Sequence, residues 1–163
     1  ARDLYLLEYT GGKLHIPTIS TQGSIKLIKA AKAKGLHITC SVAVHNLVLN
    51  EEVLMGFDSR YKVSPPLRNE EDRKALLKGL LENTIDCITS DHNPIDIENK
   101  KMEFDLAKNG TIGLESAFSA LLTVLPLEKI RTGKLTSLIL GGFLACSPNH
   151  FKVKLPPKLN PIR

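Results

Sequence analysis

The chain has 163 residues, which is enough for one domain with a substantial core, and we treat residues 1–163 as a single domain. Apolar residues make up 42% of the sequence, but no apolar run approaches the roughly 20 residues that a membrane helix needs, so a membrane protein is disfavoured. The net charge of +5 is compatible with an anionic substrate. Aromatic residues are only 5%, and four lysines fall on one predicted helix face: Lys26, Lys29, Lys32 and Lys34. Both features disfavour nucleic-acid binding.

Apolar spacing and capping residues predict alternating strands and helices. Thr21 is typical of a helix start and Gly35 of a helix stop, and Asn69 is expected to cap a second helix. The predicted strands cover residues 14–19, 36–44, 61–63 and 84–90. The predicted helices cover residues 25–34, 70–81, 114–125 and 136–145, with the helix at 114–125 apolar almost all round, and an extended tail covers residues 150–163.

This order of elements predicts an α/β protein with a parallel sheet. One possible architecture is an open doubly wound sheet, and the other is part of a (βα)8 barrel. A whole barrel needs about 250 residues, so the chain can supply only about half of one. The glycine signatures GxGxxG and GxxxxGK[ST] are absent, which disfavours a nucleotide-binding domain of the Rossmann or P-loop kind.

The three cysteines, Cys40, Cys87 and Cys146, are odd in number and have no CxxC spacing. A disulfide framework or a cysteine zinc site is therefore not expected. Cys40 and Cys87 lie in apolar runs and are interpreted as small core residues. This cysteine usage fits a reducing cytoplasm, and the first residues lack the basic-then-apolar pattern of a signal peptide.

Polar residues follow four of the predicted strands. Functional groups of parallel α/β proteins gather at the carboxyl ends of the strands, so these positions are candidates for chemistry. Asp91 is the strongest candidate, because a carboxylate there can bind a metal and exchange a proton with water. The alternative is that Asp91 caps the following turn through Asn93 and Pro94. A histidine at a strand end, such as His45, is more often a structural hydrogen-bonding group than a metal ligand.

The order of these segments resembles the dihydroorotases of the cyclic amidohydrolase group. Residues 62–68, KVSPPLR, resemble the family's K-x-N-P-P-L-R, and residues 79–86 followed by 89–94 resemble G-L-x-D-G-T-I-D and T-D-H-A-P. Residues 42–47, VAVHNL, resemble V-T-P-H-H-L, and residues 15–21 resemble H-x-x-H-x-S-T. The resemblance spans residues 14–125 in order, and its motifs are specific as a set.

The resemblance implies the C-terminal part of a (βα)8 TIM-type barrel, built like the metal-dependent hydrolases. The implied activity is the zinc-dependent, reversible hydrolysis of dihydroorotate to N-carbamoyl-aspartate in pyrimidine synthesis. His45 and Asp91 match metal ligands, with one or two zinc ions expected, and Asp91 also matches the catalytic general base and acid. Ser64, His92 and Asn93 are the candidate substrate contacts.

Four departures from the family pattern bear on activity. Thr18 stands where the family has a metal-binding histidine, leaving only the non-ligand His15 in that motif, and no H-x-H occurs in the chain. Ser64 replaces the asparagine before Pro-Pro, and Ile95 replaces the histidine that ends D-H-A-P-H. Catalytic zinc usually has three protein ligands, and only two candidates remain.

Three hypotheses follow. The chain is the C-terminal part of an active dihydroorotase, an inactive relative that serves as a structural partner of aspartate carbamoyltransferase, or an amidohydrolase for another substrate. Half a barrel also leaves an apolar edge, which predicts a homo-oligomer.

Overall fold

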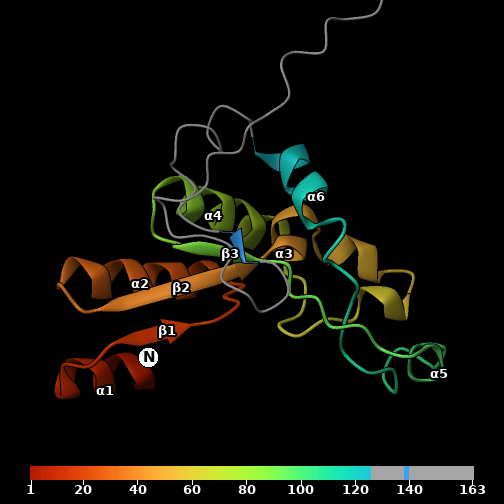
Figure 1. Ribbon diagram of the computed structural model, residues 1–163, viewed down its shortest axis with the longest axis horizontal. Coiled ribbons are helices and arrows are strands. Elements are labelled where there is room, and N and C mark those ends of the chain that lie inside the picture. The colour runs from red at the N-terminus through yellow and green to blue at the C-terminus, as the bar shows by residue number, and fades with distance from the viewer. Residues whose placement is uncertain (126–137, 140–163) are drawn as a thin grey trace, which may run out of the picture.

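The computed structural model describes residues 1–125 and 138–139 (Figure 1). Its centre is a sheet of four parallel strands in the order β1-β2-β3-β4. The strands are β1 (Leu14–Ile16), β2 (Ile38–Ala43), β3 (Cys87–Thr89) and β4 (Leu138–Ile139). The predicted parallel α/β fold is therefore present, with β1 at one edge.

The described part of the chain also contains six α-helices and two short 3₁₀-helices. They are α1 (Arg2–Thr10), α2 (Gln22–Ala33), α3 (Val44–Val48), η1 (Glu51–Leu54), η2 (Ser59–Tyr61), α4 (Glu70–Leu81), α5 (Ile97–Lys100) and α6 (Ala117–Val124). Helices α2 and α4 pack against each other, α3 contacts both α4 and α6, and α5 lies on a long loop away from the sheet (Figure 1). Within the described ranges, no helix is long and apolar enough to cross a membrane.

Local side-chain chemistry explains where the two long helices begin. The Thr21 hydroxyl accepts a hydrogen bond from the Ser24 amide at the start of α2. The Asn69 side chain does the same for the Asp72 amide at the start of α4. Gly35 follows α2 with φ 79°, a conformation that favours glycine. Both capping predictions and the stop at Gly35 are confirmed.

The core lies between the sheet and helices α2, α3, α4 and α6. Its fully buried large side chains come from strands, from helices and from the segment before β3: Ile28, Leu47, Leu76, Ile85, Ile88, Leu121, Val42 and Cys40. Burial raises the pKa of the Cys40 thiol to about 12, with the nearby Asp86 carboxylate adding to the shift. Cys40 and Cys87 are both buried and free, as predicted, whereas Cys146 and the tail at 150–163 lie outside the described residues.

Asp86 joins three elements just before β3. Its carboxylate accepts hydrogen bonds from the Cys40 amide at 2.8 Å and from the Lys32 ammonium at 2.6 Å. The backbone amide of Asp86 also donates to the Cys40 carbonyl. Side chain and backbone together therefore fix α2, β2 and the start of β3 in one arrangement. The lysine-bearing face of α2 is the solvated face that was predicted, since Lys26, Lys29 and Lys34 are exposed.

The prediction of a strand at residues 61–63 is wrong. Residues Ser59–Tyr61 form η2, whose start is capped by the Asp58 side chain. The Lys62 carbonyl then accepts from the Gly110 amide, so this backbone pairs with a loop instead of a sheet. A short run of apolar and aromatic residues does not reveal its pairing partner.

The prediction of a helix at 136–145 is wrong at Leu138–Ile139, which pair as strand β4 with Ile88 and Thr89 of β3. A short apolar run suits a buried strand as well as a helix, and its period alone does not distinguish them. The rest of that range lies outside the described residues. The helix predicted at 114–125 begins only at Ala117, and it is one-sided because Phe118 is exposed while Leu121 is buried.

Candidate functional site

Asp91 lies just beyond the carboxyl end of β3. The strand ends at Thr89, and the Thr89 hydroxyl accepts a hydrogen bond from the Asp91 amide at 3.1 Å. Asp91 has φ 48°, in the left-handed region that aspartate tolerates better than most residues. This turn directs the chain away from the sheet and leaves the Asp91 side chain about one third exposed.

His45 lies at the corresponding end of the neighbouring strand. Strand β2 ends at Ala43 and α3 begins at Val44, so His45 is in the first turn of that helix. Its side chain is only 10% exposed, and its Nε2 atom is buried without a hydrogen-bond partner. The structure thus brings two of the predicted site residues together, with His45 Nε2 lying 3.8 Å from Asp91 Oδ2.

Burial lowers the pKa of His45, and the negative charge of Asp91 only partly opposes this shift. The imidazole is therefore neutral near pH 7, and its approach to Asp91 is not a pair of full charges. At 3.8 Å it is also too long for a hydrogen bond. A neutral imidazole with an unpartnered buried nitrogen beside a carboxylate is a donor set that suits a cation between the two groups.

The His92 side chain contacts the backbone of a later segment of the chain. Its Nδ1 atom accepts hydrogen bonds from the backbone amides of Gly113 and Leu114, each at 3.2 Å. The next residue, Asn93, donates its backbone amide to the Thr111 carbonyl at 2.9 Å. Both predicted substrate contacts therefore also hold the segment 109–114 against the turn that carries Asp91.

Ser64 is exposed and precedes Pro65 through a cis peptide bond. The Asn46 side-chain amide, on α3 beside His45, donates to the Pro66 carbonyl at 3.4 Å. This contact attaches the Ser64 segment to the helix that carries His45. The Asn46 Oδ1 atom is buried without a hydrogen-bond partner. Sequence reasoning missed Asn46, although its place next to the motif histidine was a usable signal.

The segment at 15–21 adds no further ligand. The Thr18 amide donates to the Ser41 hydroxyl, and His15 is exposed with its Nδ1 paired to the Thr39 hydroxyl at 2.8 Å. Across residues 1–125 and 138–139, no group of three His, Cys, Asp or Glu side chains is arranged to hold a metal ion. His45 and Asp91 are thus a pair of candidate ligands without a third.

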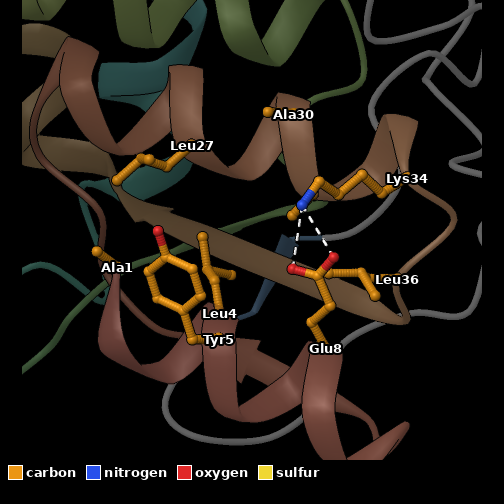
Figure 2. Close-up of a pocket in the computed structure, with 9 residues that line it drawn as sticks. Ala1, Leu4, Tyr5, Glu8, Leu27, Ala30, Lys34 and Leu36 are labelled. Carbon is orange, nitrogen blue, oxygen red and sulfur yellow. Dashed lines mark hydrogen bonds and ion pairs between the residues drawn. The ribbon is translucent and has the colours of Figure 1, made fainter.

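A hollow of about 150 Å³ between α1 and α2 lies elsewhere (Figure 2). Its lining is mostly apolar, including Leu4, Leu27 and Leu36, and the Lys34–Glu8 ion pair crosses one side. Leu36 precedes β2, so the hollow is near the amino ends of the strands. Asp91 and His45 follow the carboxyl ends, and the hollow is therefore not part of the candidate site.

Solved structures with the same arrangement are cyclic amidohydrolases. The D-hydantoinase (dihydropyrimidinase) from Thermus sp. matches with a TM-score of 0.73 and 26% identity, over 83% of this chain and 32% of that one. The L-hydantoinase (dihydropyrimidinase) from Arthrobacter aurescens matches with a TM-score of 0.71 and 27% identity, over 83% and 30% of the two chains. The predicted fold class is confirmed: the described residues form a segment of the barrel of a cyclic amidohydrolase.

Sequence comparison narrows this class. The dihydroorotase of Thermoanaerobacter sp. (strain X514) is 44% identical over 148 residues, which are 91% of this chain and 33% of that protein. The dihydroorotase of Caldicellulosiruptor saccharolyticus is 44% identical over 157 residues, 93% of this chain and 36% of that protein. No family model matches the chain. The chain is a homologue of the dihydroorotases and spans about a third of the length of these curated relatives.

A further solved structure is relevant to activity. It is described as the inactive dihydroorotase-like domain of the Chaetomium thermophilum CAD-like multifunctional protein. It matches with a TM-score of 0.57 and 30% identity, over 82% of this chain and 35% of that one. The proteins that this chain resembles therefore include at least one domain that is described as inactive.

Proposed function

We propose that this chain is part of an active dihydroorotase, which hydrolyses the cyclic amide of dihydroorotate reversibly to N-carbamoyl-aspartate. The reaction belongs to de novo pyrimidine synthesis, and we assign it to the cytoplasm. The observation that carries the proposal is the buried, unpartnered Nε2 of His45, 3.8 Å from the Asp91 carboxylate at the ends of adjacent parallel strands. The 44% identity to curated dihydroorotases supports the substrate class.

The donor pair fits part of a zinc site. Bonds of ~2.0–2.2 Å in tetrahedral geometry place two ligand atoms about 3.4 Å apart, close to the 3.8 Å separation of His45 Nε2 and Asp91 Oδ2. The lowered pKa of His45 favours the neutral imidazole that a metal requires. Because catalytic zinc usually has three protein ligands, the remaining ones are assigned to the parts of a dihydroorotase that this chain does not span.

The reaction needs water to add to the ring carbonyl carbon, followed by cleavage of the carbon–nitrogen bond. Zinc, when bound, supplies a Lewis acid that polarises the carbonyl and makes water more acidic. Asp91 takes the proton from the attacking water and returns it to the leaving nitrogen, which balances the hydrolysis. Ser64 and Asn93 are proposed to contact the substrate.

A structural role is the second candidate. It is favoured by Thr18 at the position of an expected metal ligand, and by the absence of a three-ligand group in residues 1–125 and 138–139. The named inactivity of the Chaetomium thermophilum domain supports it as well. In this case the protein would be a non-catalytic partner of aspartate carbamoyltransferase. A homo-oligomer is proposed in either case.

The full-length protein separates the two candidates. Zinc content by mass spectrometry and turnover of dihydroorotate are measured for the wild type, for Asp91→Ala and for Asp3→Ala, an exposed carboxylate on α1. We expect zinc and activity in the wild type and in Asp3→Ala, and no turnover in Asp91→Ala. A wild type that is folded but free of zinc and inactive would contradict the catalytic role and leave the structural one.

The 163-residue chain alone is expected to be inactive, since two ligands do not hold a water in position for attack. Misplacement by ~1 Å can lower a rate on the order of 100-fold. Turnover by the isolated chain that is lost in Asp91→Ala would contradict the need for a third ligand.

A further inference from the structure

The His92 side chain makes two long-range hydrogen bonds with the backbone. A single acceptor, Nδ1, receives both the Gly113 amide and the Leu114 amide at 3.2 Å, from a segment 21 residues further along the chain. An imidazole nitrogen that accepts hydrogen bonds carries no proton, so the neutral ring holds its proton on Nε2. The Nδ1 edge is thus fully occupied within the protein.

The segment that His92 holds lies directly on the turn of Asp91. A Cβ atom at Gly113 would lie 2.6 Å from the Ser90 carbonyl oxygen, so the two backbones are in closest contact there. At Gly110, which has φ 146°, a Cβ would lie 2.5 Å from the Asn93 carbonyl oxygen. The glycines of segment 110–114 therefore allow its backbone to pack closely against residues 90–93, and His92 holds the two segments together.

The same segment leads into the helix that packs beside His45. The Gly113 carbonyl accepts a hydrogen bond from Ala117, the first residue of α6. Helix α6 packs on α3, and α3 carries His45 in its first turn (Figure 1). A continuous set of contacts therefore runs from His92 through Gly113 and α6 to α3, the helix that carries His45, while Asp91 is the residue next to His92.

We propose that His92 is a positioning residue: its Nδ1 clamps Gly113 and Leu114 and so fixes the Asp91 turn relative to His45. The role deepens the proposed function, because the Asp91–His45 pair is the site on which that function rests. It differs from substrate contact, which would use the Nε2 edge of the same ring. The two edges are separable, since the side chain of asparagine reaches the position of Nδ1 and that of glutamine reaches the position of Nε2.

The test compares His92→Asn, His92→Gln and His92→Leu in the full-length protein, with His37→Leu as an exposed control at the far end of β2. Hydrogen exchange of the peptide covering residues 110–117 reports the clamp without any need for activity. His92→Leu and His92→Gln should speed exchange of the Gly113 and Leu114 amides about tenfold, because both variants lack the acceptor at the position of Nδ1 and weaken two hydrogen bonds. His92→Asn and His37→Leu should leave this exchange within about twofold of the wild type, since the asparagine side chain keeps an acceptor at the position of Nδ1.

Kinetics then tests positioning. In an active wild type, His92→Leu and His92→Gln should lower kcat on the order of tenfold or more with little change in KM, because Asp91 is misplaced. His92→Asn should restore most of kcat. The proposal is overturned if His92→Asn exchanges as fast as His92→Leu. It is also overturned if His92→Gln alone restores activity, because that result would assign His92 to substrate contact. If the wild type is inactive, the proposed function fails while the exchange data still decide whether the clamp exists.

Discussion

The sheet core and the loop at its carboxyl end are held together by different forces. In the core, β2, β3, α2 and α4 bury large aliphatic side chains such as Ile28, Leu76 and Ile88 almost completely. In the loop, residues 90–114, few side chains are buried and the large apolar residues Ile97, Leu106 and Ile112 are exposed. Individual hydrogen bonds, such as those to His92, and close packing at Gly110 and Gly113 keep that loop in place.

This difference separates stability from function. Aliphatic burial is non-directional, so the core tolerates small shifts but loses free energy when volume is removed. A hydrogen bond to one ring nitrogen is directional, so the loop backbone shifts from its position when that single acceptor atom is replaced. Substitutions in the core should therefore lower global stability, whereas substitutions in the loop should disturb the site more than the fold. Substitutions in the two regions of the full-length protein test this separation.

The largest effect on stability is expected for Ile88→Ala on β3, where the side chain is fully buried. Removing it should lower the free energy of unfolding by about 2–5 kcal/mol, through lost burial and the cavity left behind. Ile97→Ala, at a position on α5 that is 61% exposed, is the matched control and should change it by less than about 0.5 kcal/mol. Urea unfolding measures both. Equal losses would show that the loop carries as much of the stability as the core.

A contact between the partly exposed Asp86 carboxylate and the buried Cys40 backbone should have the next largest effect. Asp86→Ala leaves the Cys40 amide without its carboxylate acceptor and the Lys32 ammonium without its partner. We expect a loss of about 1–3 kcal/mol in the free energy of unfolding, the usual cost of an unsatisfied buried donor. Asp86→Asn keeps an acceptor for the amide and should lose less. If the two variants unfold alike, the charge of Asp86 matters and its hydrogen bond to Cys40 does not.

The sequence predicted best those features that depend on neighbouring residues. Thr21 and Asn69 cap their helices with side chains that bond amides three residues ahead, so the signal and its effect lie in the same segment. The resemblance to dihydroorotases likewise rested on local motifs. By contrast, the strand at Leu138–Ile139 is defined by its pairing with Ile88 and Thr89, some 50 residues away, and no local pattern carries that information.

The same limit applies to the site. The rule that parallel strands end at one edge was enough to select His45 and Asp91, and the structure brings these side chains within 3.8 Å. Their assignment as metal ligands remains a prediction. The contact of His92 with Gly113 and Leu114, and that of Asn46 with Pro66, depend on loops whose paths follow no periodic pattern. Such contacts emerge only when the chain is folded.

Gly113→Ala tests the loop directly and should affect the site more than the fold. The added Cβ would lie 2.6 Å from the Ser90 carbonyl oxygen, so the segment must move away from the Asp91 turn. We expect a loss of about 1 kcal/mol in unfolding free energy, at the low end for overpacking, and a fall in turnover on the order of tenfold. Gly23→Ala in α2 is the control, where the new Cβ meets only the Thr21 hydroxyl at 3.9 Å. Unfolding and turnover are measured for both, and unchanged turnover in Gly113→Ala would contradict the role given to this contact.

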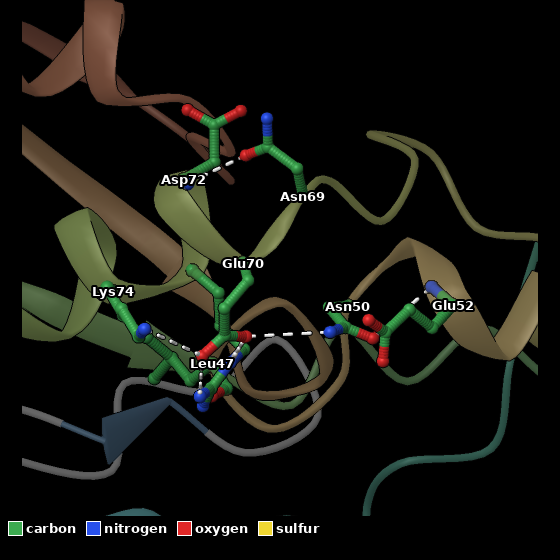
Figure 3. Close-up of polar contacts among 8 residues, drawn as sticks. Leu47, Asn50, Glu52, Asn69, Glu70, Asp72 and Lys74 are labelled. Atoms are coloured by element: carbon green, nitrogen blue, oxygen red, sulfur yellow. Dashed lines mark hydrogen bonds and ion pairs between the residues drawn. The ribbon is translucent and has the colours of Figure 1, made fainter.

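The smallest effect is expected at Glu70, where a partly exposed polar cluster joins α4 to α3 and the chain after it (Figure 3). Both carboxylate oxygens of Glu70 accept from Arg73 at 2.6 Å, and the Arg73 guanidinium also donates to the Leu47 carbonyl of α3. The hydrogen bonds from Arg73 are the main cause that lowers the pKa of Glu70 from 4.5 to about 2.

A carboxylate with a lowered pKa in the folded state stabilises the protein above its unfolded pKa and loses this contribution as the pH falls through its folded pKa. The stability difference between the wild type and Glu70→Gln should therefore be constant above about pH 4.5 and shrink as the pH falls toward about 2. Thermal unfolding between pH 3 and 7 measures this difference, with roughly pH 3–4.5 as the informative window. Glu71→Gln removes a carboxylate from the exposed side of the same helical turn and is the matched control. If both variants show the same pH dependence, the effect comes from negative charge at the start of α4, and the contact of Glu70 with Arg73 adds nothing of its own.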